Sequence, residues 1–292
     1  MEYGFAPPVV DQPPFAALQG IEVTVQPGSG TANNLKLVAA GQAAFAVIDM
    51  TGGIQARAAG NTAFRVVSAI YQRSVSCILA FAGRGISTPK DLEGKKVGYS
   101  AGGVNYTLFP AYARLAGVDA GKVQWQQMVA PALRPVFATG QVDAITEVTI
   151  SAGAVKTLTG RDVVLLPYSQ FLGDLYGNVL ATSAAIAAGN PGLVRRFTTA
   201  MTQALQYAIG HPEEAGTVLN THVKEYPATA ATSEVQATET YIRSGLGIGA
   251  IEERRVAQSI AILQGAGLIP PGLTPADVLA VDLLPDPARP TG

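Results

Sequence analysis

The sequence has few charged residues and a single cysteine, and each shortage excludes a class of function. Charged residues make up 14% of the 292-residue chain, and Lys plus Arg (20) nearly balance Asp plus Glu (21). Since nucleic acids and anionic membranes are bound through a basic face, we expect neither to be the main partner. Cys77 stands alone in the apolar stretch SVSCILAFA, so we expect a buried core residue and neither a disulfide framework nor a cysteine metal cluster.

Familiar catalytic and metal-binding patterns are also missing. His211 and His222 lie in polar C-terminal stretches and lack the spacing of metal ligands. The sequence contains no P-loop, no G-x-G-x-x-G turn and no G-x-S-x-G elbow. We therefore expect no catalytic residue, no metal and no cofactor.

Long apolar runs are absent too, since none reaches the roughly 18 residues that a membrane span needs. No signal-peptide pattern is present, because Met1 leads almost directly into the strand-like EYGFAPPVV. This leaves two readings, a cytosolic protein or the processed form of an exported one.

What the sequence does contain is an alternation of short apolar strands and helix-length segments. The spacing predicts helices at 33–42, 108–117 and 133–141, each ending at a glycine. This order predicts parallel sheets with helices on their faces. The predicted strands cover residues 21–27, 43–49, 64–71, 76–82, 95–100, 122–128, 142–148 and 162–168.

The length of the chain suits two lobes of about 100–150 residues each. The glycine-rich stretch FAGRGISTPKDLEGKKVG (81–98) and the segment LYGNVLATSAAI (175–186) look like crossings between them. We expect residues 1–83 and 180–292 to form lobe 1, with the C-terminal helices, and residues 84–179 to form lobe 2. Two crossings make a hinge with a cleft between the lobes.

Four strands run directly into small polar residues that open a helix: QPGSGTANN (26–34), IDMTGGIQ (48–55), YSAGGVNYT (99–107) and MVAPALR (128–134). The first N–H groups of a helix lack partners and carry partial positive charge, so they bind anions and polar ring atoms. Ligands of open α/β sheets lie beyond the carboxyl ends of the strands. Four such turns flanking one cleft favour a binding protein.

With these features the sequence resembles a known family, the extracytoplasmic solute-binding proteins of ABC importers. The resemblance is to the branch for nitrate, sulfonate, taurine and pyrimidine precursors of thiamine, and it covers nearly the whole chain. Its landmarks, in order, are VQPGSGTANNLKLVAAGQAAFAVIDM, AIYQRS, GISTPKDLEGKKVGYSAGG, LRPVFATGQVDAITE, LPYSQFLGDLYGNVLATS and NPGLVRRFTTAMTQALQYAIGHPEEA. It implies an α/β fold of the type II periplasmic-binding-protein kind, with two lobes, a hinge and a ligand cleft between the lobes.

The resemblance also implies partners and site residues. The partners are a small-molecule ligand and the permease and ATPase subunits of an ABC importer, the location is extracytoplasmic, and we expect a monomer. Tyr3 and Asp11 are further candidates near the first strand. The ligand-binding residues that it implies are Ser29, Gly30, Thr31, Asn33, Asp49, Thr51, Gly52, Ser100, Gly102, Asn105, Tyr106, Glu147, Asp174, Tyr176 and Asn178.

This sequence departs from the family at two places. Glu147 stands where an apolar or aromatic residue is common, so it either favours a ligand with N–H donors or positive charge, or is a solvated carboxylate at a strand end. The segment DQPPFAALQG (11–20) is shorter than a parallel crossover normally needs, which weakens the case for Asp11, Gln12 and Phe15 as site residues.

Aromatic and basic residues complete the predicted cleft. Tyr106, Tyr168 and Tyr176 lie at predicted cleft positions where they would stack on a flat ring, whereas Trp125 is expected in the core. Arg73 and Arg134 are the nearest cations for a carboxylate or sulfonate.

Three functions remain open. The first is a solute receptor of an ABC importer, for a thiamine-precursor pyrimidine, a sulfonate such as taurine, or an aromatic carboxylate. The second is a pyrimidine-synthesising enzyme on the same scaffold, which needs a histidine cluster in the cleft. The third is a ligand-sensing domain of a transcription regulator, which needs a helix-turn-helix ahead of the first strand.

Overall fold

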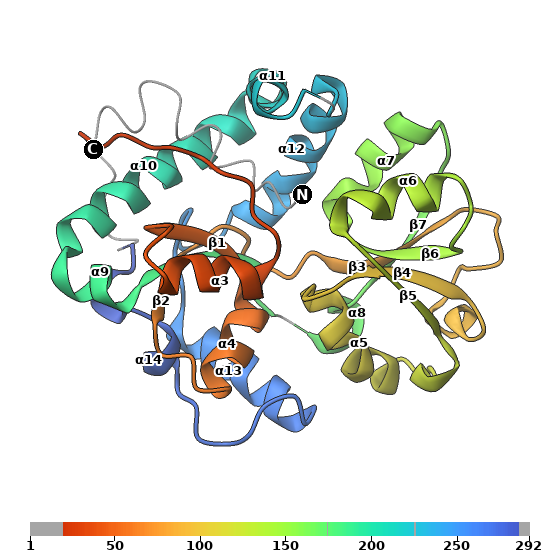
Figure 1. Cartoon of the computed structure of the whole chain (residues 1–292), viewed down its shortest axis with the longest axis horizontal. Coiled ribbons are helices and arrows are strands. Elements are labelled where there is room, and N and C mark those ends of the chain that lie inside the picture. Colours follow the sequence, from red (N-terminus) through yellow and green to blue (C-terminus); the bar gives the residue numbers. More distant parts are fainter. Residues whose placement is uncertain (1–19, 174, 225, 286–292) are drawn as a thin grey trace.

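The protein is built around two separate β-sheets, each covered by helices (Figure 1). The computed structural model describes residues 20–173, 175–224 and 226–285. We call the part around the three-stranded sheet lobe 1 and the part around the five-stranded sheet lobe 2. In Figure 1 lobe 1 lies on the left and lobe 2 on the right.

The sheet of lobe 1 has the order β1-β8-β2, formed by Phe45–Asp49, Asn178–Ser183 and Phe64–Ala69. The central strand β8 runs antiparallel to both neighbours, and Asp49 pairs with Asn178. Side chains of β8 alternate between two apolar clusters, because Val179 and Ala181 pack on one face and Leu180 on the other.

The sheet of lobe 2 has the order β5-β4-β6-β3-β7. Strand β4 is parallel to β5 and β6, whereas β3 is antiparallel to β6 and β7. Helices α6 and α7 cover one face, and α5 and α8 cover the other (Figure 1). The strands are β3 (Ser76–Phe81), β4 (Lys96–Ser100), β5 (Gln124–Met128), β6 (Ala144–Val148) and β7 (Val163–Pro167).

Both sheets are therefore mixed or antiparallel, which corrects the expectation of parallel sheets. The strands that enter each lobe directly from the other are β3 and β8, and both run against their neighbours. The helix-connected strands β4, β5 and β6 are parallel to one another, as the alternation predicts.

The chain crosses between the lobes in two places. The first crossing lies between Ala69 and Ser76, because β3 belongs to the sheet of lobe 2, and not near residue 84 as expected. The glycine-rich stretch after β3 is a loop inside lobe 2 that leads to β4. The second crossing lies between Pro167 and Asn178, close to the expected return near residue 180.

The three predicted helices form close to the expected ranges, as α3 (Thr31–Ala39), α5 (Val104–Leu115) and α6 (Leu133–Ala138). Each is followed by a glycine with positive φ: Gly41, Gly117 and Gly140. A left-handed residue just past a helix end caps its last carbonyl groups, which is why glycine stands there. The remaining helices of this half of the chain are α4 (Met50–Ala58), α7 (Ala152–Thr159), α8 (Ser169–Leu172) and α9 (Ala184–Gly189).

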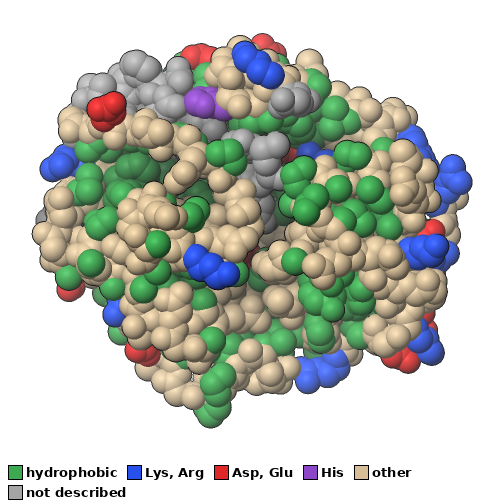
Figure 2. All heavy atoms as spheres, in the orientation of Figure 1, with side chains coloured by type: hydrophobic (Ala, Val, Ile, Leu, Met, Phe, Trp, Pro, Cys, Tyr) green, Lys and Arg blue, Asp and Glu red, His purple; other side chains and the backbone are tan. Residues whose placement is uncertain are grey.

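The C-terminal part of the chain is helical, as expected, and packs on lobe 1. None of the helices in the described ranges is long and apolar enough to cross a membrane. Figure 2 shows Lys, Arg, Asp and Glu scattered over this face of the molecule without a patch of one sign. The helices are α10 (Pro191–Gly210), α11 (Pro212–His222), α12 (Ala228–Ile242), α13 (Glu253–Gly265) and α14 (Pro275–Val278).

One predicted strand does not form. Residues 21–29 contain no strand, although half-buried and exposed positions alternate from Ile21 to Val25. A strand needs a partner for its backbone groups, and no described strand pairs with this segment. It runs instead along a hollow beside β1 and α10.

Candidate functional site

Helices α3 and α4 of lobe 1 begin next to each other. Asp49 Oδ1 accepts hydrogen bonds from the N–H groups of Thr51 (2.8 Å) and Gly52 (3.3 Å), so Asp49 caps α4. The N–H of Asp49 donates to Thr31 Oγ1 at 2.9 Å. A β-carbon on Gly52 would lie 2.8 Å from Thr31 Cγ2, so only glycine allows this approach.

The turn before α3 is fixed by Gly30 and Asn34. Gly30 has φ 94° and ψ 158°, a conformation that is almost restricted to glycine. The N–H of Ser29 donates to Asn34 Oδ1 at 3.1 Å, and Asn34 Nδ2 donates to the carbonyl of Val47 at 2.8 Å. Ser29 and Asn33 are exposed at the start of the helix.

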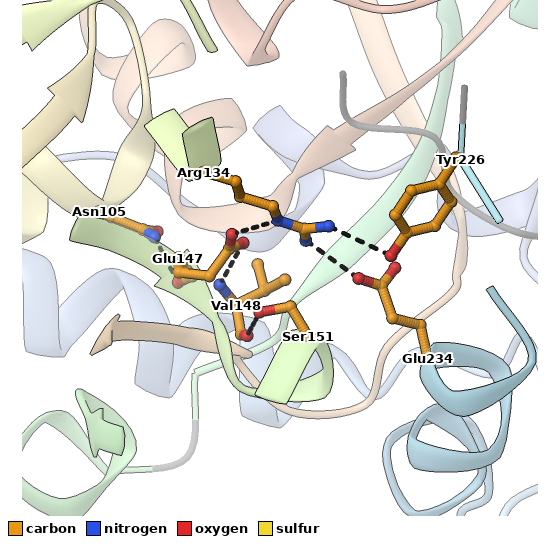
Figure 3. Close-up of polar contacts among 7 residues, drawn as sticks. All are labelled: Asn105, Arg134, Glu147, Val148, Ser151, Tyr226 and Glu234. Atoms are coloured by element: carbon orange, nitrogen blue, oxygen red, sulfur yellow. Dashed lines mark hydrogen bonds and ion pairs between the residues drawn. The ribbon is translucent and has the colours of Figure 1, made fainter. Parts of the chain in front are cut away.

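The matching turn of lobe 2 precedes α5. Gly102 has φ 76°, and the N–H of Gly103 donates to the carbonyl of Ser100 at 3.1 Å. Asn105 Nδ2 donates to the carbonyl of Glu147 at 2.7 Å, so the start of α5 is held against the end of β6 (Figure 3).

These two turns meet across the boundary between the lobes. A β-carbon on Gly30 would lie 3.6 Å from the carbonyl oxygen of Gly102. Nearby, Thr107 Oγ1 of α5 donates to Gln55 Oε1 of α4 at 3.4 Å. The structure thus gathers helix starts from both lobes at one place. The predicted site residues on these elements are Ser29, Gly30, Thr31, Asn33, Asp49, Thr51, Gly52, Ser100, Gly102, Asn105 and Glu147.

The fourth predicted helix start carries Arg134, which lies in a cluster of charged groups (Figure 3). Arg134 Nε donates to Glu147 Oε2 at 2.8 Å, and its Nη2 donates to Glu234 Oε1 at 2.9 Å. The third donor, Nη1, reaches the hydroxyl of Tyr226 at 3.1 Å. The predicted carboxylate of Glu147 and the predicted cation Arg134 therefore bind each other.

Burial and charge act against each other in this cluster. Burial by itself would lower the pKa of Arg134, but the charges of Glu147 and Glu234 raise it well above its ordinary value. Burial raises the pKa of Glu234 and outweighs the lowering by Arg134 and Tyr226. Arg134 therefore stays charged. The carboxylate of Glu234 loses hydration by lying in the cluster.

Two of the three tyrosines expected in the cleft are core residues, which corrects that expectation. Tyr168 is 1% exposed, stacks on Tyr112 and donates from its hydroxyl to the carbonyl of Asn105. Tyr176, also 1% exposed, lies against Arg255. Tyr168 follows β7, and Tyr176 lies in the second crossing; neighbouring elements cover both side chains. In the sequence a tyrosine at a strand end looks like a cleft residue, but here the surrounding structure buries it.

The side chain of Tyr106 is exposed, but another aromatic ring covers one of its faces. Its ring stacks on Tyr99 with the centroids 4.0 Å apart and meets Trp125 edge-on at 5.0 Å. Trp125 is half-buried against Phe109, close to the core position expected. Tyr106 thus belongs to an aromatic cluster on α5, β4 and β5 next to the turn of lobe 2.

The other predicted residues lie at the crossings or outside the described ranges. The carbonyl of Asn178 accepts from the N–H groups of Ile70 and Tyr71, so it joins the two crossings. Arg73 Nη2 donates to the carbonyl of Thr240 at 2.9 Å and is not in the gathered site. The residues outside the described ranges are Tyr3, Asp11, Gln12, Phe15 and Asp174.

Sequence reasoning missed Glu234 and Tyr226, because it looked for polar groups only at strand ends. A signal for Glu234 exists in the helical pattern. It is a carboxylate on the apolar face of α12, next to the buried Ala230, Ala231, Val235 and Thr238. A carboxylate among such neighbours requires a buried partner.

A hollow of about 490 Å³ lies elsewhere, in lobe 1. It is bounded by segment 21–28, β1 and the side chains of Leu193, Phe197 and Met201 from α10. It contains none of the predicted site residues and brings no group of lobe 2 into contact. The gathered helix starts, which both lobes contribute, remain the better candidate site.

Comparison with known proteins places the chain in a family and identifies its fold. A family model described as NMT1/THI5 like matches residues 15–215, which is more than half of the chain. The chain belongs to the NMT1/THI5-like family. It is 26% identical over 277 residues to a Haemophilus influenzae protein named "Putative thiamine biosynthesis protein", covering 91% of this chain and 83% of that one.

Solved structures similar to this NMT1/THI5-like protein identify its fold. The alkanesulfonate-binding protein SsuA from Xanthomonas axonopodis pv. citri, bound to MOPS, matches with a TM-score of 0.72 and 18% identity, over 97% of this chain and 94% of that one. The periplasmic aliphatic sulphonate binding protein SsuA from Escherichia coli matches with a TM-score of 0.65 and 20% identity, over 84% and 78%. The fold is therefore that of the periplasmic binding proteins, as the resemblance implied.

Proposed function

We propose that this protein is the substrate-binding component of an ABC importer, which captures a small polar or aromatic nutrient between its lobes and delivers it to a membrane permease. The observation that carries the proposal is the meeting of helix starts from both lobes at the turns of Gly30 and Gly102. Helix starts of this kind bind polar and anionic ligands through backbone N–H groups. An extracytoplasmic location follows from this function.

The similar proteins support this role, but their names point to more than one class of ligand. Two of the similar solved structures are sulfonate-binding proteins by name, and the curated relative is named for thiamine biosynthesis. We therefore retain three ligand classes: sulfonates such as taurine, pyrimidine precursors of thiamine, and aromatic carboxylates.

The second candidate is a pyrimidine-synthesising enzyme, which the name of the curated relative favours. That chemistry needs a histidine cluster in the cleft. His211 precedes α11 and stacks on Tyr207, and His222 is the last residue of α11. Neither contributes to the gathered turns, so the binding function is the better supported of the two.

A thermal-shift panel tests the proposal. The compounds are MOPS, taurine, 4-amino-5-hydroxymethyl-2-methylpyrimidine and benzoate, and a compound at 100 times its dissociation constant adds about 2.7 kcal/mol of stability. The stabilising compound should be recovered chemically unchanged, as mass spectrometry would show. A product of altered mass would instead favour the enzyme, and no shift with any compound would count against a receptor for these classes.

Matched variants locate the site within the same assay. Asn33→Ala removes an exposed amide at the start of α3 and should weaken the shift. Asn61→Ala is the control, because it removes an amide that lies away from the turns. The Asn61 amide oxygen accepts from the N–H of Ala63, and its loss should leave the shift unchanged. Equal shifts in both variants would remove Asn33 from the site.

A further inference from the structure

Helix α12 is a second part of lobe 1 that lies against lobe 2, besides the turns described above. It packs on α7 and on the 3₁₀ turn η4 (Thr149–Ser151), and in Figure 1 it stands between α10 and α7. Its C-terminal end meets the first crossing, because the N–H of Gln72 donates to the carbonyl of Tyr241 at 2.6 Å. Thr149 Oγ1 of lobe 2 donates to the Tyr241 hydroxyl at 2.8 Å. Helix α12 therefore lies along the boundary between the lobes, with its C-terminal end at the first crossing.

Glu234 lies seven residues before Tyr241 on this helix, which is about two turns or roughly 10 Å farther from the crossing. At this distance from the crossing a small rotation of the lobes separates groups that are in contact when the lobes are closed. Glu234 Oε1 lies 2.9 Å from Arg134 Nη2 of lobe 2 (Figure 3). Tyr226, which precedes α12, meets Nη1 of the same guanidinium.

The guanidinium of Arg134 serves both lobes at once. Glu147, its partner within lobe 2, has a side chain that is 12% exposed, and Glu234, its partner in lobe 1, one that is 10% exposed. If the lobes separated with α12 remaining on lobe 1, Arg134 would keep Glu147 and lose Glu234 and Tyr226. The charge of Arg134 would then still have a partner.

The strength of this contact is limited by the hydration that Glu234 gives up. Glu234 loses hydration when the contact forms, so its hydrogen bond to the Arg134 guanidinium must outweigh that cost for the contact to favour closure. The net gain is therefore small, and the lobes can still open, as a binding protein that must release its ligand requires.

The same contact is connected to the turn of lobe 2. Glu147 accepts from Arg134 with its side chain and from Asn105 with its carbonyl group. Its Oε1 also accepts from the N–H of Val148 at 3.0 Å, which fixes the carboxylate relative to β6. The start of α5 and Arg134 therefore share one hydrogen-bond partner, Glu147.

We propose that Arg134 is a closure latch: a positioning residue that binds Glu234 and Tyr226 of the opposite lobe and so holds the cleft closed over the ligand. This proposal rests on the proposed function for its purpose. Whether closure depends on the contact between Arg134 and Glu234 can be measured without any ligand.

The experiment measures the distance between the lobes by pulsed electron spin resonance. Spin labels are attached at Lys36→Cys on α3 and Leu158→Cys on α7, since both side chains are exposed. The native Cys77 is buried and does not compete for the label. Distances are recorded on the full chain without added ligand, in the otherwise native background and in Glu234→Gln.

Glu234→Gln keeps the size and the hydrogen-bonding oxygen but removes the charge. Because a hydrogen bond is roughly twice as strong when its partners are charged, the ratio of closed to open molecules should fall about threefold or more. Arg134→Lys, which cannot reach three partners at once, should fall between the two. Circular dichroism and the melting curve verify that each variant is folded.

Glu239→Gln is the matched control. Glu239 lies on the same helix but pairs with the exposed Arg243 of its own lobe. Exposed pairs of this kind contribute little, so the closed-to-open ratio should stay within about twofold. Equal distance distributions in Glu234→Gln and Glu239→Gln, or an unmodified background that is already open, would overturn the latch.

The two proposals fail separately. A ligand panel without a hit leaves the ligand-free distance result standing. Equal distance distributions together with a positive panel reject the latch alone.

Discussion

The lobes are held together by different means at two places, which we call the α12 side and the turn side. On the α12 side, charged side chains reach across: Arg134 of lobe 2 binds Glu234 and Tyr226 next to lobe 1. On the turn side, two helix starts lie close together, because a β-carbon added to Gly30 would be 3.6 Å from the carbonyl oxygen of Gly102. The first side depends on charge and the second on backbone turns with positive φ.

This difference separates two tasks that a binding cleft must perform. The glycine turns begin helices, whose first N–H groups suit contact with a ligand. The charged side gives a directional contact between side chains. We therefore expect the turn side to respond to changes of backbone conformation and the α12 side to respond to changes of charge.

The largest effect is expected from Arg134→Met. It leaves Glu147 and Glu234 as two carboxylates without their shared cation, and removing one partner of a buried pair costs about 3 kcal/mol or more. Urea unfolding measures this loss. Arg243→Met, which breaks an exposed pair on α12, is the control and should cost less than about 1 kcal/mol. Similar losses in the two variants would show that the α12 side does not depend on the cluster.

Gly30→Ala should cost about 2 kcal/mol, because its φ of 94° and ψ of 158° are strained for any residue with a β-carbon. Gly41→Ala is the comparison, since Gly41 also has a positive φ, 70°, but nothing lies within 4 Å of the added carbon. It should cost about 1 kcal/mol and leave the lobes in place. Urea unfolding and the spin-label distance report the two effects, and a Gly30→Ala protein as stable and as closed as Gly41→Ala would contradict the account.

Asp49→Ala tests how far the start of α4 depends on its cap. The carboxylate satisfies two N–H groups, and loss of such a cap costs about 1 kcal/mol. Asp49→Asn retains an acceptor oxygen and should cost less. Chemical unfolding of the two variants decides the matter, and an Asp49→Ala protein of unchanged stability would show that the turn is held by Thr31 alone.

The smallest effect concerns pH. Burial raises the pKa of Glu234 above its ordinary value of 4.5, so the folded state retains this proton longer than the unfolded state. The associated stability is fully present below pH 4.5 and is lost as the pH rises through the raised pKa. Stability measured against pH should therefore fall less steeply in Glu234→Gln than in the native protein. The slope of Gly30→Ala should equal the native slope, and a native slope in Glu234→Gln would contradict the raised pKa.

Much of the fold could be predicted from the sequence, because local patterns decide its elements. Seven of the predicted strands form within about two residues of the expected bounds, a margin usual for element ends. The direction of β3 and β8 could not be predicted, since apolar strands that cross between lobes look the same in either orientation. The first crossing was misplaced because the glycine-rich loop after β3 resembles a linker.

The turns of the candidate site could be predicted only where glycine and capping residues mark them. Gly30, Asp49 and Gly102 carry such local signals. The contact of Arg134 with Glu234 joins residues that are 100 positions apart, and no local pattern encodes such a pairing. The burial of Tyr168 and Tyr176 was missed for the same reason, because the residues that cover them come from distant helices.

The most direct test is amide hydrogen exchange, read by mass spectrometry, with the most stabilising compound of the panel. If a ligand lies between the lobes, exchange should slow at once in residues 28–34 of lobe 1 and in residues 100–105 of lobe 2. Protection confined to one lobe, or to the hollow between residues 21–28 and α10, would contradict the account.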